Sequence, residues 1–298
     1  MVYIVLATVT SVLMLVILRL FEYRRAHTFY ALIFNYLSAF LCGITNVFLF
    51  NKHVNLSMSI GGWILTAVEG VLFITVFYWM AQTTKYYGMS VTSVANKMSL
   101  IFPVVSAFII FNEPIGWIKW LGLLLALLSV YMVTYTDTKE GITGYRNKII
   151  YPLLVFVGSG IVDSIINYGN KTYVTTNDRQ LMFTSFVYLF ALLTGLVYLK
   201  IIPPDKSTNK RFYHQESFSW KSTVFLGLLL GIPNFYNLFF IIQALNSKMF
   251  LSSQIFLILN VSNIIVSALT GVLLFKENMR WINWMGIALA TTSIILVV

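Results

Sequence analysis

The chain has 298 residues, of which 58% are hydrophobic and only 10% are charged, and its mean hydropathy is +0.82. A soluble protein carries about a quarter charged residues, so water-soluble enzymes and disordered chains are excluded and an integral membrane protein is indicated. The net charge of +10 does not indicate a nucleic-acid partner, because basic residues in a membrane protein mainly set its orientation.

Ten apolar stretches follow one another along the chain, each near the roughly 20 residues that a helix needs to cross a bilayer. Continuous apolar runs such as 121–133 lack the alternation of a membrane β-barrel. The predicted fold is therefore all-α, a polytopic membrane protein with ten transmembrane helices. The expected spans are residues 2–20, 29–50, 61–81, 91–111, 117–136, 149–170, 180–202, 222–244, 251–275 and 281–298.

The basic residues are distributed unevenly between the two sets of loops. Of the 20 Lys and Arg residues, fourteen lie near loops that follow odd-numbered spans and five near loops that follow even-numbered spans. By the positive-inside rule this bias places the odd loops in the cytoplasm. We therefore expect a multi-pass protein of the plasma (inner) membrane with both termini outside.

The chain repeats itself. Residues 111–122 align without gaps on residues 275–286, at an offset of 164, and Phe, Glu, two Trp, Ile and Gly recur in both segments. The same offset relates Asn96 to Asn260, Ala126 to Ala290 and Ser129 to Ser293. This pattern predicts two five-helix repeats, 1–137 and 138–298. Because five is odd, the copies would cross the membrane in opposite orientations, as in many alternating-access carriers.

A series of Pro, Glu and Gly crosses the fourth and fifth spans. It consists of Pro103, Glu113-Pro114 and Gly122, with Glu277 and Gly286 repeating part of it in the second copy. Together with the ten spans and the duplication, this series resembles the EamA-like branch of the drug/metabolite transporter superfamily, over nearly the whole chain. The second copy departs from the pattern, because Ser267 stands where the first has Pro103.

The resemblance implies a secondary carrier of small organic solutes or metabolites, often an exporter, with a central cavity between the halves. Ten-helix members of the family are usually drawn with both termini inside, opposite to the orientation that the charge bias predicts. We expect a monomer or homodimer in the lipid bilayer.

Two ionisable residues lie inside the spans of the first repeat. Glu69 is within the third span, and Lys97 is about seven residues into the fourth. Charges inside a bilayer are costly and are normally paired or functional. Two roles are open for them: an ion pair with each other, or binding of solute or proton.

The sixth span carries a polar stripe. At 100° per residue, its four members fall within an arc of about 80°; they are Ser159, Asp163, Asn167 and Asn170. Such a stripe faces protein or a wet cavity, and we favour cavity lining over simple helix–helix hydrogen bonding. Asp163 is the first candidate for solute contact or proton coupling, and the competing account makes it a partner of Lys97 or Lys171.

Four further amides are candidates for solute contact. Asn234 and Asn237 follow Pro233, which interrupts the hydrogen bonding of the eighth span. Carriers expose backbone to solute at such interruptions, although a kink filled by Asn side chains is an equal alternative. Asn96 and Asn260 occupy equivalent places in the repeats, so they either meet at the pseudo-twofold axis or make ordinary interhelical hydrogen bonds.

Enzyme motifs are not found. The sequence has no G-x-S-x-G, no H-E-x-x-H and no phosphate-binding G-x-x-x-x-G-K-[ST], its three His are isolated, and Cys42 is its single cysteine. We therefore expect no enzyme activity, no metal and no other cofactor. A membrane-embedded enzyme or a channel built on the same helices is the alternative.

The sequence thus predicts a secondary active transporter for a small-molecule solute, with a coupling proton or cation as a further candidate partner. Amides, two acids, one lysine and many aromatic residues suit amino acids, nucleosides, amines or drug-like compounds.

Overall fold

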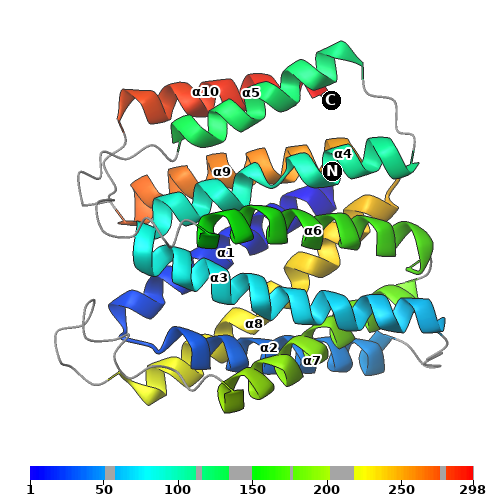
Figure 1. Cartoon of the computed structure of the whole chain (residues 1–298), viewed down its shortest axis with the longest axis vertical. Helices are drawn as coiled ribbons and strands as arrows, with labels where there is room; N and C mark the ends of the chain where they lie inside the picture. Colours follow the sequence, from blue (N-terminus) through cyan, green and yellow to red (C-terminus); the bar gives the residue numbers. More distant parts are fainter. Residues whose placement is uncertain are drawn as a thin grey trace. The chain divides into compact units, whose positions relative to one another are not determined.

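The computed structural model describes residues 1–50, 58–111, 116–133, 150–174, 177–201, 218–275 and 280–297. Within these ranges the chain forms ten α-helices and no strand (Figure 1), which agrees with the predicted all-α class. The helices are α1 (Val2–Tyr23), α2 (Thr28–Phe50), α3 (Ile60–Met98), α4 (Ile101–Phe111), α5 (Trp117–Val133), α6 (Ile150–Thr172), α7 (Asn177–Ile201), α8 (Trp220–Asn246), α9 (Ser252–Phe275) and α10 (Trp281–Val297).

The length and the surface of the helices suit a lipid bilayer. Six of them are long and apolar enough to cross a membrane, by length and composition. Large apolar side chains lie on their outer surfaces, and Trp117 and Trp281, the first residues of α5 and α10, are 89% and 78% exposed. Exposed apolar surface on this scale is costly in water and suits lipid, with Trp at the interface. The chain is a multi-pass membrane protein.

The boundary between the third and fourth predicted spans was wrong. A loop was expected between residues 81 and 91, but α3 continues through this segment to Met98, and the break comes at Ser99 and Leu100. Pro103 explains the position, because it is tolerated in the first turn of the new helix, where its missing N–H has no partner to lose. In the second copy α9 runs without a break through Ser267, which occupies the equivalent position.

The helices pack into two compact units. The first unit is Met1–Thr8, Thr75–Tyr168 and Ile241–Val298, and the second is Val9–Ile74 and Gly169–Phe240. Neither unit corresponds to one of the predicted repeats, since each takes helices from both halves of the chain. The division into repeats 1–137 and 138–298 therefore remains a matter of sequence equivalence.

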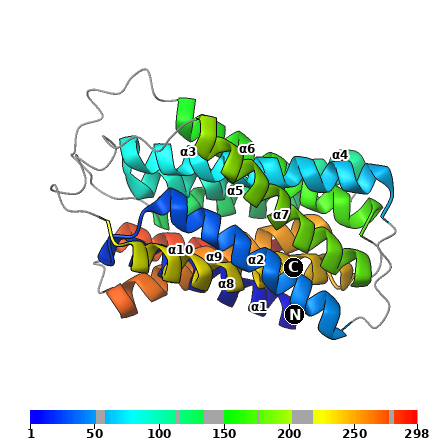
Figure 2. The same ribbon diagram turned by 90° about the horizontal axis from the view of Figure 1, so that it is seen from below.

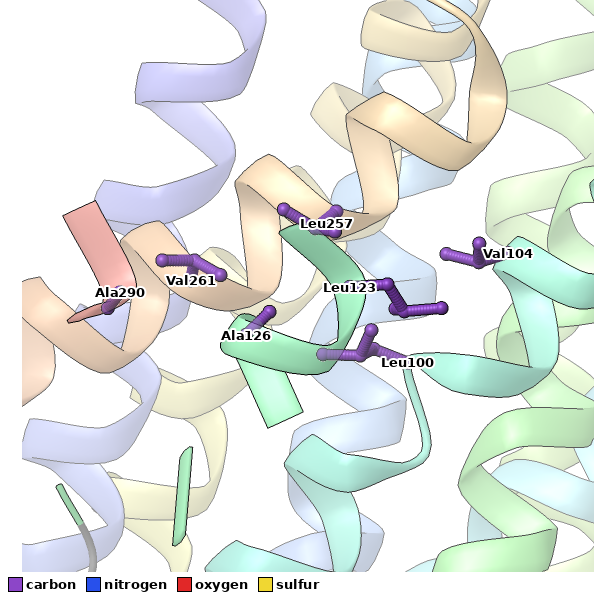
Figure 3. Packing of buried hydrophobic residues seen from close by; sticks show 7 residues of the cluster. All are labelled: Leu100, Val104, Leu123, Ala126, Leu257, Val261 and Ala290. Atoms are coloured by element: carbon purple, nitrogen blue, oxygen red, sulfur yellow. The ribbon is translucent and has the colours of Figure 1, made fainter. Parts of the chain in front are cut away.

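In the first unit α5 packs against α10, α4 against α9, and α9 against α10 (Figures 1 and 2). A buried apolar cluster joins these four helices and the turn before α4 (Figure 3). Its members are Leu100, Val104, Leu123, Ala126, Leu257, Val261 and Ala290.

α5 and α10 run in opposite directions. Asn283, the third residue of α10, donates from Nδ2 to the carbonyl oxygen of Met132, the second-last residue of α5, at 3.0 Å. Further along, Ala126 and Ala290 are fully buried in the same cluster. One turn from each alanine, a buried serine hydroxyl donates back to the alanine carbonyl oxygen at 2.7 Å, Ser129 in α5 and Ser293 in α10. Residues that are equivalent in sequence therefore have the same local structure.

In the second unit α2 packs against α7, also in opposite directions (Figure 1). Gly43, in the second half of α2, approaches Ser185 in the first half of α7. Ile33, near the start of α2, lies beside Gly195 near the end of α7. Small residues permit this close approach, as is usual between membrane helices. Each unit thus contains one antiparallel pair of helices whose numbers differ by five, α5 with α10 and α2 with α7.

Candidate functional site

The polar stripe of α6 is confirmed as a face of one continuous helix. Ser159 and Asn167 are buried and Asp163 is half-buried. Neither the Ser159 hydroxyl nor the Asn167 amide has a hydrogen-bond partner in the described part of the chain, and both groups are shielded from solvent. Ser164, which lies off this face, instead donates to the carbonyl oxygen of Gly160 at 2.7 Å. The stripe therefore keeps hydrogen-bonding capacity that its own helix does not use.

Lys97 is the charged neighbour of this face. It lies in the last turn of α3, rather than seven residues into a separate fourth span as the sequence suggested. Its ammonium interacts electrostatically with the Asp163 carboxylate. No ion pair or hydrogen bond between Lys97 and Asp163 is found among the residues that the structure describes.

Glu69 has a different environment. It lies in the second unit, is fully buried in α3, and interacts electrostatically with Tyr188 of α7. Glu69 thus interacts with Tyr188 and Lys97 with Asp163, and the ion pair considered between Glu69 and Lys97 stays a prediction.

Asn234 belongs to a buried hydrogen-bond network in the second unit. The Tyr188 hydroxyl donates to the carbonyl oxygen of Asn234 at 2.7 Å, and Asn234 Nδ2 donates to Oδ1 of Asn35 at 3.0 Å. The Tyr36 ring stacks on Tyr188 with centroids 6.3 Å apart. Sequence reasoning missed Tyr188, Tyr36 and Asn35, because isolated polar residues in apolar spans show no periodic pattern.

The other three predicted amides have different environments. Asn237 Nδ2 donates to Oγ1 of Thr10 at 3.3 Å. Asn260 Nδ2 donates to the carbonyl oxygen of Phe256 in its own helix at 3.0 Å. The half-buried Asn96 precedes Lys97, and no hydrogen bond joins it to Asn260 in the described ranges. The amides of Asn96 and Asn260 do not meet as a hydrogen-bonded pair.

The nine predicted residues thus fall into two groups. The first unit holds Ser159, Asp163, Asn167, Lys97, Asn96 and Asn260, and the second holds Glu69, Asn234 and Asn237. The first group combines one carboxylate, one ammonium and open hydrogen-bonding groups. This combination can bind a polar solute inside an otherwise apolar protein, which is the usual role of ionisable residues in membrane spans.

The apolar surface and the membrane-length helices define a multi-pass membrane protein. Residues 1–135 match the model of the EamA-like transporter family, in agreement with the resemblance to the drug/metabolite transporter superfamily drawn from the sequence motifs.

Two further similarities extend over most of the chain. An uncharacterized protein of Haemophilus influenzae is 27% identical over 230 residues, which cover 76% of this chain and 72% of the relative. A protein of known crystal structure shares the fold with a TM-score of 0.70 at 14% identity, over 99% of this chain and 97% of its own.

Proposed function

We propose that the protein is a secondary active transporter that exports a small organic metabolite or drug-like solute by alternating access. In this proposal the repeats 1–137 and 138–298 have inverted orientations, the solute binds between them, and no nucleotide is hydrolysed.

The antiparallel packing of equivalent helices carries the proposal. α5 and α10 each close one repeat, and they lie antiparallel through the Asn283–Met132 hydrogen bond. α2 and α7, the second helix of each repeat, also lie antiparallel. If equivalent helices run in opposite directions, the repeats are inverted, and exchange between the two conformations then opens the site to alternate sides. The match of residues 1–135 to the family ends two residues before the proposed end of the first repeat.

The charged residues Lys97 and Asp163 mark the candidate binding site for the solute. Lys97 belongs to the first repeat and Asp163 to the second, so their interaction spans the two repeats within one compact unit. A conformational exchange that moves one repeat against the other changes the distance between these groups. Asp163 is therefore our first candidate for solute contact or coupling to a proton or cation.

Cysteine labelling tests the inverted topology and the orientation. In a Cys42→Ser background, single cysteines at Lys139 and Lys206 should react with an impermeant thiol reagent from the cytoplasmic side only, because the charge bias places both there. Both positions lie outside the described residues. Labelling of the two from opposite sides would contradict the inverted five-helix repeats, and labelling of both from outside would reverse only the orientation.

The absence of nucleotide coupling has its own test. Purified protein in liposomes should move solute down an imposed ion or solute gradient without ATP. A requirement for ATP would contradict the proposal.

A further inference from the structure

The turn between α1 and α2 is bound to the start of α8, within the second unit. The backbone N–H of Ser219 donates to the carbonyl oxygen of Arg25 at 3.0 Å, and the backbone N–H of His27 donates to Oγ1 of Thr223 at 2.9 Å. The end of α1 and the start of α8 accordingly lie side by side in both views (Figures 1 and 2). The two joined segments, which we call the α1–α8 edge, are residues 22–30 and 218–225.

Four aromatic rings pack together at this edge. The centroid of the His27 ring lies 4.7 Å from that of Tyr30 and 5.2 Å from that of Phe218, and the Trp220 ring lies 5.0 Å from that of Tyr30. Trp220 is 51% exposed, and Tyr23, at the end of α1, is 63% exposed. Exposed Trp and Tyr side chains at helix ends mark the membrane–water interface. The α1–α8 edge therefore lies at the level of the lipid headgroups.

The same edge has an excess of positive charge. The side chains of Arg24, Arg25 and Lys221 are exposed, and Glu22 is the one acidic residue in the sequence of the two segments. Arg25 has a left-handed backbone conformation, with φ at 53°, at the position after a helix end where glycine is usual. The chain thus places an arginine where glycine would fit more easily, which supports a function for its charge.

An exposed apolar stripe continues from Lys221 along α8. Phe225, Leu228 and Ile232 are exposed, and at 100° per residue they lie within about 40° of Lys221 around the helix axis. A basic group at headgroup level is therefore followed, on one face of the same helix, by apolar surface that extends into the membrane. This order matches the two parts of a phospholipid, a charged headgroup and its acyl chains.

We propose that the α1–α8 edge binds an anionic phospholipid, with the phosphate group at Arg24, Arg25 and Lys221 and an acyl chain along the stripe of α8. A zwitterionic lipid has the same phosphate but carries a cation beside it, which the three basic side chains repel. The edge therefore favours an anionic lipid. This inference does not depend on the proposed transport function, because it concerns a surface that faces the bilayer.

Thermal-shift binding to the full-length protein in a neutral detergent compares two lipids with identical acyl chains, phosphatidylglycerol and phosphatidylcholine. Phosphatidylglycerol should raise the unfolding midpoint at concentrations at which phosphatidylcholine does not, because a ligand that binds only the folded protein stabilises it. Glycerophosphoglycerol, the headgroup without acyl chains, should have no effect at the same concentrations, because it cannot contact the stripe.

Two lysine variants at opposite ends of α8 locate the site. Lys221 lies in the first turn of α8 and Lys248 two residues beyond its last, and both side chains are exposed. Each substitution by Gln removes one positive charge, so a general attraction of the protein for acidic lipid weakens equally in both. Lys221→Gln should raise the dissociation constant for phosphatidylglycerol about fivefold, the loss expected for one basic residue at a membrane surface. Arg24→Gln should do the same, whereas Lys248→Gln should change the constant by less than about twofold.

Three results would overturn the proposal. The first is equal stabilisation by phosphatidylglycerol and phosphatidylcholine, which would show that the edge does not select an anionic lipid. The second is an equal effect of Lys221→Gln and Lys248→Gln on phosphatidylglycerol binding. The third is stabilisation by glycerophosphoglycerol as strong as that by the lipid, which would assign the edge to a soluble anion.

Discussion

Asn283 at the start of α10 and Met132 at the end of α5 are joined by a hydrogen bond of 3.0 Å. The side chain of Asn283 also accepts from the backbone N–H of Arg280 through Oδ1 at 2.8 Å, as a capping residue does. One amide therefore caps α10 and satisfies a terminal carbonyl of α5, which has no partner within its own helix. This residue joins the start of α10 to the end of α5, as antiparallel packing of the two helices requires.

Replacing this amide should weaken the first unit. Asn283→Ala removes both hydrogen bonds from a side chain that is 6% exposed, so we expect a loss of about 1–3 kcal/mol in unfolding free energy. The midpoint of thermal unfolding in detergent measures it. Thr291→Ala is the control, because this exposed hydroxyl of the same helix bonds only Ile287 and its loss should cost less than about 0.5 kcal/mol. Equal midpoints for the two variants would argue against this role of Asn283.

Helix packing in the second unit depends on a glycine in α3. A Cβ at Gly70 would lie 2.7 Å from the carbonyl oxygen of Val187 in α7, a backbone atom that cannot move aside. Gly70→Ala should therefore destabilise the protein by about 1–3 kcal/mol through overpacking. In Gly195→Ala, by contrast, the new Cβ would meet Ile33 at an ordinary 3.5 Å, and better helix propensity should leave stability unchanged or slightly raised. Chemical denaturation of both variants in detergent would show the difference, and a neutral Gly70→Ala would refute the close approach.

The Tyr188 hydroxyl should contribute more to the free energy of unfolding than an average hydroxyl group does. It is fully buried and donates to the carbonyl oxygen of Asn234, the residue after Pro233 in the continuous helix α8. Tyr188→Phe leaves that acceptor without its buried donor and should cost about 1–3 kcal/mol. Thr45→Val, which removes an exposed hydroxyl in the same unit, should be close to neutral. Unfolding midpoints compare the two, and a neutral Tyr188→Phe would contradict the network.

His27 should make stability depend on pH. It lies between α1 and α2, its ring centroid is 4.7 Å from that of Tyr30 and 5.2 Å from that of Phe218, and Nδ1 is buried. Burial lowers the pKa of His27 below its ordinary value of about 6.5, and a backbone hydrogen bond only partly opposes this. The folded state therefore binds this proton less readily than the unfolded state. The contribution of the neutral ring to stability is complete above about pH 6.5 and is lost as pH falls through the folded-state pKa.

A variant that keeps the aromatic packing isolates this effect. His27→Phe cannot be protonated, so its unfolding midpoint should fall less than that of the natural protein between pH 7 and pH 5. Parallel pH profiles for the two proteins would show that His27 does not titrate in this range.

The sequence predicted those features that depend on local geometry. The face formed by Ser159, Asp163 and Asn167 follows from helical periodicity alone and is found as expected. The equivalence of Ser129 and Ser293 was visible as a repeat, and the structure shows that both make the same hydrogen bond. Such features need only the spacing of residues along one helix.

Features that depend on contacts between distant segments were harder to predict. The end of α3 was placed too early, because counting apolar residues cannot detect that the helix continues through a more polar segment to Met98. The sequence left the partner of Lys97 open between Glu69 and Asp163, because both are carboxylates inside apolar spans. Only the packing of the helices shows which of them interacts with Lys97. Tyr188 had no signal of its own, because a tyrosine in an apolar span resembles any packing residue.

Counterflow in liposomes tests the central claim, alternating access without nucleotide, most directly. Purified protein is reconstituted without ATP into vesicles loaded with the metabolite that stabilises it most in a thermal-shift screen, and uptake of the same labelled metabolite from a dilute outer solution is followed. The account predicts transient accumulation above the outer concentration, because an alternating site exchanges outer for inner solute one molecule at a time. A channel would give uptake that never exceeds the outer concentration and is not stimulated by internal solute, and this result would contradict the account. Uptake that requires ATP would also contradict it.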